Sequence, residues 1–221
     1  MKIYDLTLTV TDTTVTWHNS EVGLTVKPVA TIGEKSVANV SVLTMGAHLG
    51  THLDAPRHFV ADGGTVETID PERLVGWMDV VEVYDRPVVD AADLENAGVP
   101  ADCKRLLIRT DNTGKRLIHD PVFHQDYVGL TAAAAQWIAD RGLLLVGLDY
   151  LSVGMHGPEN IDVHVTLLSK SVVLVETLDL ENVPVGRYLG TILPLKLTGA
   201  EATPCRAILV DMSAPAVDGA I

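Results

Sequence analysis

Short runs of alternating or continuous apolar residues, separated by turn residues, recur along this chain. The alternation over residues 2–10 predicts a half-buried strand, and the unbroken run from Leu143 to Leu148 predicts a strand buried on both faces. Residues 22–31 and 36–45 are rich in Val and Thr and flank Gly33-Glu34-Lys35, which predicts a hairpin. Further strands are expected at 78–84, 105–110, 171–176, 190–197 and 205–212.

Helices are predicted at fewer places, where a capping residue precedes a helical pattern or a turn residue ends it. They are expected at Asp70 to Glu72, Asp90 to Gly98, Thr131 to Arg141 and in a short segment around His164. Residues 111–130 lack periodicity and are expected to form a loop. Because some strands are adjacent in sequence and others are joined through helices, we expect an α/β fold with a mixed sheet and a few flanking helices.

The composition narrows the class of protein. At 221 residues with 47% hydrophobic side chains, the chain can fold as one domain over residues 1–221. Sixteen basic against twenty-nine acidic residues give a formal charge of −13, which would repel phosphate backbones and anionic lipid surfaces. The longest apolar runs are too short to span a bilayer. Nucleic acid and membrane are therefore not expected as partners.

Two features indicate the cellular compartment. The N-terminal residues alternate as a strand and carry no small-residue cleavage site, so they do not resemble an export signal. Cys103 and Cys205 have no CxxC spacing and are expected to be reduced. Both features predict a cytoplasmic protein.

The candidate chemistry is concentrated between His48 and Phe59, in the run His-Leu-Gly-Thr-His-Leu-Asp-Ala-Pro-Arg-His-Phe. His48, His52 and Asp54 offer the mixed nitrogen and oxygen ligands that suit Zn²⁺ or Mn²⁺. On a helix, Asp54 would lie well round the cylinder from His48, and the proline would break the next turn. We therefore expect an extended, kinked segment.

Two small residues support that expectation. Gly50 would let the backbone approach an ion closely, and Pro56 would redirect the chain so that His58 returns toward the other three side chains. A lone histidine is usually a surface or satisfied core residue. The grouping of four such side chains around Gly-Thr favours a metal site instead.

This segment resembles the His-x-Gly-Thr-His-x-Asp-x-Pro-x-His motif of the cyclase-like metal-dependent hydrolases, which include bacterial kynurenine formamidases and isatin hydrolases. His164 in Asp-Val-His-Val-Thr-Leu-Leu, Glu176 at the end of Val-Val-Leu-Val-Glu, and Gly147-Leu-Asp-Tyr-Leu-Ser-Val153 also resemble family segments. The resemblance extends from the first strand to about Leu180. It implies the cyclase-like swivelling β/β/α fold and assembly as a homo-oligomer, a dimer or larger.

The resemblance also implies roles for these residues. In family members with two metals, the residues matching His48 and His52 hold the first ion and the residue matching Asp54 bridges both. Those matching His164 and Glu176 hold the second ion. His58 matches the proton-transfer group. The native metal, Zn or Mn, and the choice between one ion and two remain open.

Two divalent ions bring four positive charges, against three negative ones from Asp54, Glu176 and a hydroxide, so such a site stays electrophilic. The expected reaction is hydrolysis of a small-molecule substrate, an aryl formamide such as N-formylkynurenine. The alternatives are opening of a cyclic amide or lactone, as isatin hydrolases do, and a metal-binding protein without turnover.

Several other aromatic and imidazole side chains have roles that the sequence leaves open. Trp17 is expected either to wall an apolar substrate pocket or to pack on the surface, and the segment Thr16-Trp17-His18-Asn19 departs from the aromatic-Pro-Gly-Asp segment of the formamidases. His156 follows a buried strand and is a candidate substrate contact. His119 and His124 lie in no motif and are expected to face solvent.

Overall fold

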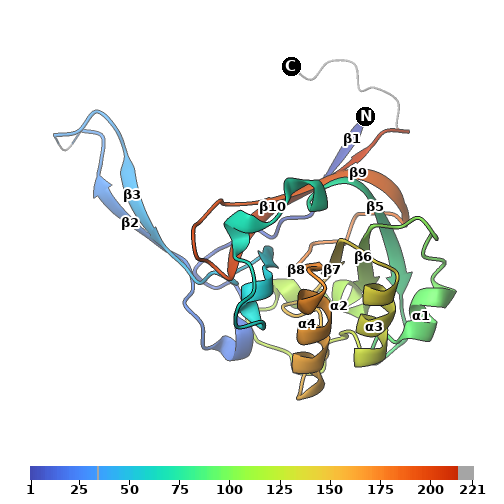
Figure 1. Ribbon diagram of the computed structural model, residues 1–221. Coiled ribbons are helices and arrows are strands. Elements are labelled where there is room, and N and C mark those ends of the chain that lie inside the picture. The colour runs from blue at the N-terminus through green and yellow to red at the C-terminus, as the bar shows by residue number, and fades with distance from the viewer. Residues whose placement is uncertain (34, 214–221) are drawn as a thin grey trace.

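The computed structural model describes residues 1–33 and 35–213 of the chain. One mixed sheet contains β1 (Lys2–Asp5), β4 (His52–Asp54), β5 (Val75–Val83), β6 (Arg105–Thr110), β7 (Leu145–Leu148), β8 (Val173–Glu176), β9 (Gly186–Pro194) and β10 (Ala202–Asp211). The strand order is β1-β10-β4-β8-β7-β6-β5-β9, and β9 pairs again with β10. This last pairing closes the sheet into a ring with β1 outside it (Figure 1).

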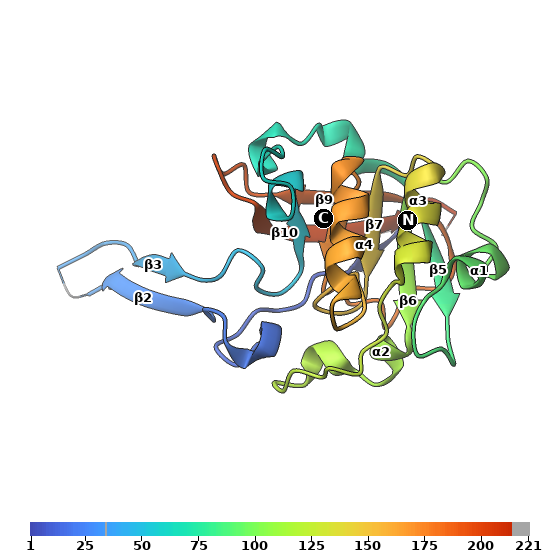
Figure 2. The ribbon, with the colours of Figure 1, turned by 60° about the horizontal axis from the view of Figure 1, so that its bottom comes forward.

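The helices lie against one side of this ring. Strands β5, β6, β7 and β8 run parallel, and the other pairings in the sheet are antiparallel. The helices are α1 (Ala91–Asn96), α2 (Asp111–Gly114), α3 (Ala132–Asp140) and α4 (Glu159–Ser169). Figure 2 shows α3 and α4 side by side over the parallel strands. The mixed α/β sheet with few helices is the architecture that the sequence predicts.

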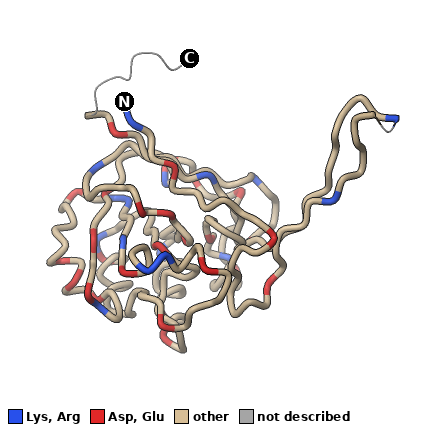
Figure 3. The backbone as a smooth tube through the Cα atoms, turned by 180° about the vertical axis from the view of Figure 1, so that it is seen from behind, with Lys and Arg blue, Asp and Glu red and all other residues tan. Residues whose placement is uncertain are grey.

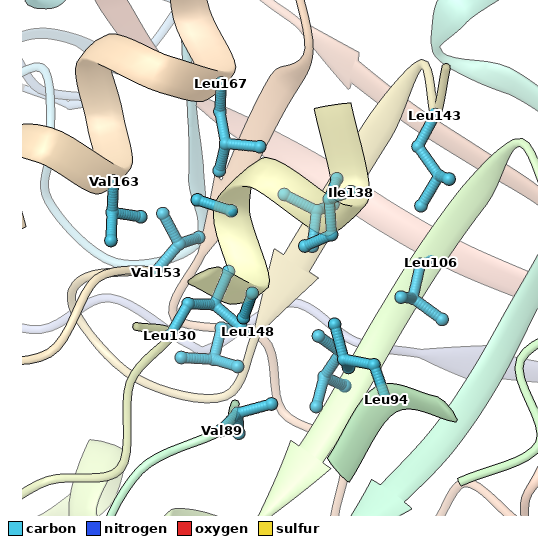
Figure 4. Close-up of a cluster of buried hydrophobic side chains, with 14 of the residues drawn as sticks. Val89, Leu94, Leu106, Leu130, Ile138, Leu143, Leu148, Val153, Val163 and Leu167 are labelled. Atoms are coloured by element: carbon cyan, nitrogen blue, oxygen red, sulfur yellow. The ribbon is translucent and has the colours of Figure 1, made fainter. Parts of the chain in front are cut away.

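The parallel strands separate two apolar cores. Leu106 and Leu148 face the helices and pack with Ile138 and Leu167 (Figure 4), whereas Leu107 points into the ring. Alternating residues of a strand face opposite sides, so a strand with a core on each side must be apolar throughout. This is the physical reason for the unbroken apolar run that predicts β7.

A second sheet consists of β2 (Thr25–Ala30) and β3 (Val40–Thr44), the predicted hairpin. It projects from the body of the protein (Figure 1). The Gly46 amide donates to the Val22 carbonyl at 2.8 Å and closes its base. Of the expected turn, Glu34 lies outside the described residues.

Three local predictions need correction. The first strand ends at Asp5, and beyond it only an isolated bridge joins Thr7 to Leu178 among the described residues. The helix expected at Asp70 is a single 3-10 turn, Pro71–Arg73, with Asp70 as its cap. Residues 111–130 are not all loop: α2 and a 3-10 turn at Leu117–His119 lie there, each too short to produce a periodic pattern.

No helix in the described part of the chain has the length and apolar character needed to cross a bilayer.

Candidate metal centre and active site

Strand β4 places two of the candidate ligands in the middle of the sheet, between β10 and β8. His52 and Asp54 are separated by one residue and therefore point to the same face of the strand. Gly50 precedes the strand with φ of 68°, and a Cβ there would lie 2.5 Å from Val10 Cγ2. The left-handed backbone and the contact with Val10 therefore explain the glycine, whereas we expected it to make room for an ion.

Pro56 redirects the chain after this strand, as predicted. Pro56–His58 form a 3-10 turn, in which the His58 amide donates to the Ala55 carbonyl at 3.0 Å. The turn brings His58 Nε2 to 3.9 Å from Asp54 Oδ2. The kinked segment therefore returns His58 toward the two ligands on β4.

The distant candidates reach the same place. His52 is paired with Glu176 in the register of β4 and β8, and His52 Nε2 lies 3.2 Å from Glu176 Oε2. His164, on α4, has its Nε2 3.3 Å from Glu176 Oε1. His48 Nδ1 lies 3.1 Å from Asp54 Oδ1. The structure thus brings all six predicted side chains of the centre together.

Asp54 places a buried carboxylate within this cluster. Both of its carboxylate oxygens are buried and accept no hydrogen bond, although imidazole nitrogens lie 3.1, 3.6 and 3.9 Å away. A buried carboxylate that accepts no hydrogen bond is costly, and positive charge beside it, on an imidazole or on a bound cation, offsets that cost. The imidazole nitrogens and carboxylate oxygens around it form the donor set that Zn²⁺ and Mn²⁺ accept. The residues therefore fit a divalent ion.

Distances divide the ligand atoms into two groups that share Asp54. One group is His48, Asp54 and His58, the other is His52, Asp54 and Glu176, and the ligand atoms in each lie within 4.8 Å of one another. This grouping differs from the one that the resemblance implies. His52 lies with Glu176 and not with His48, His58 joins the group of His48, and His164 contacts Glu176 without belonging to either group. The shared carboxylate agrees with a bridging position.

The electrostatics distinguish His58 from the other three imidazoles. Burial lowers the pKa of each, but carboxylates outweigh burial at three of them: Asp54 raises the pKa of His48 to about 9, and Glu176 raises those of His52 and His164. At His58, burial prevails over the charge of Asp54, and the pKa is lowered. His58 is therefore the imidazole suited to be neutral at neutral pH.

Backbone groups outside the centre contact the side chains of His52, His164 and Glu176. The Nδ1 atoms of His52 and His164 lie 2.8 Å from the carbonyl oxygens of Gly50 and Asn160, respectively. The Val153 amide donates to Glu176 Oε1 at 2.8 Å. Such contacts fix the ring orientation and direct Nε2 of both histidines toward the carboxylates.

A cavity of about 170 Å³ opens onto the cluster. Its other walls are Trp17, Glu21, Phe59, Leu151, Ser152 and Asn160. Trp17 thus lines the pocket and also packs edge-on against Phe123, with ring centroids 4.9 Å apart. Ser152 belongs to the segment that resembles the family, whereas Glu21 and Asn160 stand in no pattern that could have marked them.

The other four histidines lie outside this cluster, and His18 packs against the rings of Phe123 and His156, with centroids 4.8 and 5.4 Å away. His156 packs against the rings of Trp17 and Phe123, with centroids 6.1 and 6.0 Å away. His124 is half-buried, not exposed as expected, and lies 2.8 Å from Asp120. His119 is exposed, as expected, and forms a third group of ligand atoms with Asp179 and Glu181, but exposed acidic groups are common without an ion.

Comparison with known proteins decides the family. Residues 4–154 match the family model described as "Putative cyclase". The chain belongs to this cyclase family. "Cyclase-like protein 2" of Arabidopsis thaliana is 36% identical to it over 217 residues, which cover 95% of this chain and 79% of that protein. A kynurenine formamidase of Delftia acidovorans is 32% identical over 183 residues, 81% of this chain and 84% of that protein.

A solved structure described as a potential metal-dependent hydrolase with cyclase activity shares the fold of this cyclase-family chain. Its TM-score is 0.81 at 31% identity, over 94% of this chain and 96% of that chain. This likeness confirms the predicted cyclase-like fold. The family model covers His48, His52, Asp54 and His58 and ends before His164 and Glu176, which the folded chain brings beside them.

Proposed function

We propose that this protein is a metal-dependent hydrolase that cleaves the amide bond of a small aryl formamide such as N-formylkynurenine. The buried carboxylate of Asp54, which accepts no hydrogen bond and is surrounded by imidazoles beside an open cavity, carries this proposal. A closed structural site would leave no room for substrate. The formamidase relative and the likeness to a potential metal-dependent hydrolase support the same class of reaction.

In this proposal, one or two ions of Zn or Mn would be held by His48, His52, Asp54, His164 and Glu176. A bound divalent cation supplies Lewis acidity, which lowers the pKa of a water to about 7 and polarises a carbonyl oxygen. The carboxylates of Asp54 and Glu176 balance part of the cationic charge.

His58 is the proton-transfer group in this scheme. Its side chain lines the cavity, is 27% exposed, and has a lowered pKa, so a neutral imidazole faces the substrate. It can take a proton from the attacking water and give it to the departing amide nitrogen. An amine leaves far more easily once its nitrogen carries that proton.

Two aromatic walls favour a flat substrate. Trp17 and Phe59 line the cavity, and Phe123 packs behind Trp17. Aromatic side chains hold an aryl group through apolar burial and ring contacts. Ser152 and Asn160 add polar groups that can orient the amide.

One observation favours a second substrate class, cyclic amides or lactones. His18 and Asn19, next to Trp17, adopt positive φ values of 51° and 53°, and this segment lacks the Pro-Gly pair of the formamidases. The pocket wall is therefore shaped differently at this position. Ring opening of a compound such as isatin would use the same ligands and the same His58.

We also propose that the protein works as a homo-oligomer in the cytoplasm. The hairpin exposes large apolar side chains, including Val26 at 53%, Val42 at 52% and Leu43 at 63%. An isolated hairpin is marginally stable in water, and apolar side chains exposed on both of its faces favour a protein partner. Lys27 and Lys35 are the charged residues of its described part (Figure 3), whereas the whole chain carries −13, so a second copy offers a surface of opposite charge.

Metal analysis followed by turnover assays tests the proposed activity. Purified protein is analysed for Zn and Mn, stripped with a chelator, and assayed with N-formylkynurenine, isatin and simple lactones before and after either ion is restored. We expect hydrolysis of the formamide only after the ion is restored. Full activity without a divalent ion, or bound metal without turnover of any of these compounds, would contradict the proposal.

A further inference from the structure

Two histidines of the centre, His52 and His164, share an arrangement in which one nitrogen faces a carboxylate and the other faces a backbone carbonyl. His52 and His164 present Nε2 to Glu176, and backbone carbonyl oxygens lie 2.8 Å from their Nδ1 atoms. A neutral imidazole carries one hydrogen. An acceptor beside one nitrogen therefore leaves the lone pair of the other free for a cation.

His48 is placed the other way round. Its Nδ1 faces Asp54 Oδ1 at 3.1 Å, and its Nε2 points outward, 3.5 Å from Glu201 Oε1. The outer neighbour of His48 is thus a side-chain carboxylate, whereas the outer nitrogens of His52 and His164 face neutral backbone carbonyls. Glu201 is not among the ligand groups and does not line the cavity.

The backbone fixes Glu201 at this position. The Ala55 amide donates to the Glu201 carbonyl at 2.8 Å, and the next residue, Ala202, is paired with Asp54 in the register of β10 and β4. The start of β10 is therefore tied to the strand that carries Asp54. This connection holds the carboxylate of Glu201 beside His48, although the side chain is 42% exposed.

We propose that Glu201 is a positioning residue that holds His48 in the tautomer with its hydrogen on Nε2 and its lone pair on Nδ1, directed at a cation beside Asp54. This inference rests on the metal site of the proposed function. A carboxylate behind a ligand imidazole fixes the ring and makes the coordinating nitrogen more basic. Glu201 acts only through His48.

The test is metal affinity, measured by competition with a chromogenic chelator on stripped protein. We expect Glu201→Ala to bind Zn²⁺ about 10 to 100-fold more weakly than the wild type. Glu201→Gln keeps an oxygen acceptor without the charge, so its loss should be clearly smaller. Nitrogen-15 spectra of the zinc-loaded wild type should show His48 with its hydrogen on Nε2, and a hydrogen on Nδ1 would overturn the inference.

A matched control comes from Glu67, which contacts the loop just before β10. Glu67 Oε1 accepts a hydrogen bond from the Gly199 amide at 3.1 Å, two residues before Glu201, without an ion pair to His48. We expect Glu67→Ala to loosen this loop. Zinc affinity should stay within about twofold of the wild type, because no contact to a metal-binding side chain is lost. An equal loss in Glu67→Ala would show that the loop matters and the carboxylate does not, which overturns the inference.

Two failures can be told apart. If stripped wild-type protein binds neither Zn²⁺ nor Mn²⁺, the proposed function fails together with this inference. If the wild type binds metal and Glu201→Ala binds it equally well, only the role of Glu201 is wrong. Thermal unfolding of each variant without metal shows whether the fold is intact.

Discussion

His52 and Glu176 lie opposite each other on neighbouring antiparallel strands, β4 and β8, with His52 Nε2 3.2 Å from Glu176 Oε2. The pairing joins a motif in the first quarter of the chain to a carboxylate in its last quarter. Glu176 also contacts His164 on α4, so a single buried side chain links a helix and two strands at the centre. The register of two short strands thus determines whether the site exists.

Replacing Glu176 with glutamine should remove metal binding while keeping the fold. The amide oxygen can still accept the Val153 N–H, but the negative charge that offsets a cation is lost. We expect zinc affinity to fall by at least about 10 to 100-fold, and turnover with it. Metal content of the purified variant measures the effect directly.

Glu95 provides the control for this substitution. It is exposed and accepts a hydrogen bond from Trp137 Nε1 at 3.3 Å, which an amide oxygen can also accept. Glu95→Gln should retain full metal content. If Glu176→Gln also retains it, Glu176 is not a ligand.

His58→Ala should separate metal binding from turnover. His58 lines the cavity, and its lowered pKa favours the neutral imidazole that a proton-transfer group needs. We expect metal content to stay near that of the wild type and kcat to fall about 10² to 10⁴-fold. His124→Ala, which removes a half-buried imidazole bonded to Asp120, should leave both quantities unchanged. Loss of metal from His58→Ala would instead make His58 a ligand.

The sequence predicts residues of this centre well in two cases: where they are close together in a motif, and where they stand at the end of a clear strand pattern. The extended segment with a turn at Pro56 follows from backbone rules alone. Glu176 could be suspected because a carboxylate at the end of an apolar strand needs a cationic partner. The convergence of His164 and Glu176 on Asp54 was expected only from the family resemblance, because β4 and β8 are adjacent in space but distant in sequence.

Other features have no local signal. Glu201 and Glu21 are charged residues in polar segments, and only the tertiary structure brings them near His48 and the cavity. Nor could the pairing of β9 with β10, which closes the ring, be read from periodicity. A strand pattern shows which face is apolar and leaves the neighbouring strand undetermined.

The hairpin should control assembly. Val42 and Leu43 are consecutive in β3 and therefore point to opposite faces of the hairpin. The double substitution Val42→Asp with Leu43→Asp places a charge on each face, so docking on a second copy should be lost. We expect light scattering after size exclusion to show a monomer. Val122→Asp, an exposed change elsewhere, should keep the wild-type mass, and a wild-type monomer would contradict the proposed assembly.

Both cysteines should be unreactive in the folded protein. Burial raises the pKa of Cys103 and of Cys205 to about 12, so both thiols stay protonated from pH 7 to 9. The thiolate is the reactive form, and its fraction would become large only near pH 12. A thiol reagent should therefore label neither residue at pH 8, and both in denaturant. Rapid labelling of the native protein would contradict this expectation.

Asp149 holds together the loop that supports Glu176. Its buried carboxylate accepts backbone N–H bonds from Thr110 at 2.8 Å and Thr113 at 3.1 Å, together with their hydroxyls. Four residues later, Val153 donates its amide to Glu176 Oε1. Asp149 thus ties the end of β7 to the start of α2 and fixes the backbone beside the metal centre.

Asp149→Asn should destabilise the protein because the amide nitrogen would face N–H donors that the carboxylate now accepts. Leaving such buried donors without partners costs about 1 to 3 kcal/mol. For a chain of this size, each kcal/mol lowers Tm by about 2 to 4 °C, so we expect a fall of about 2 to 12 °C by calorimetry. Asp126→Asn, at an exposed position, should leave Tm within about 2 °C, since surface changes usually cost under about 0.5 kcal/mol. An unchanged Tm in Asp149→Asn would show that this hydrogen-bond network does not stabilise the fold.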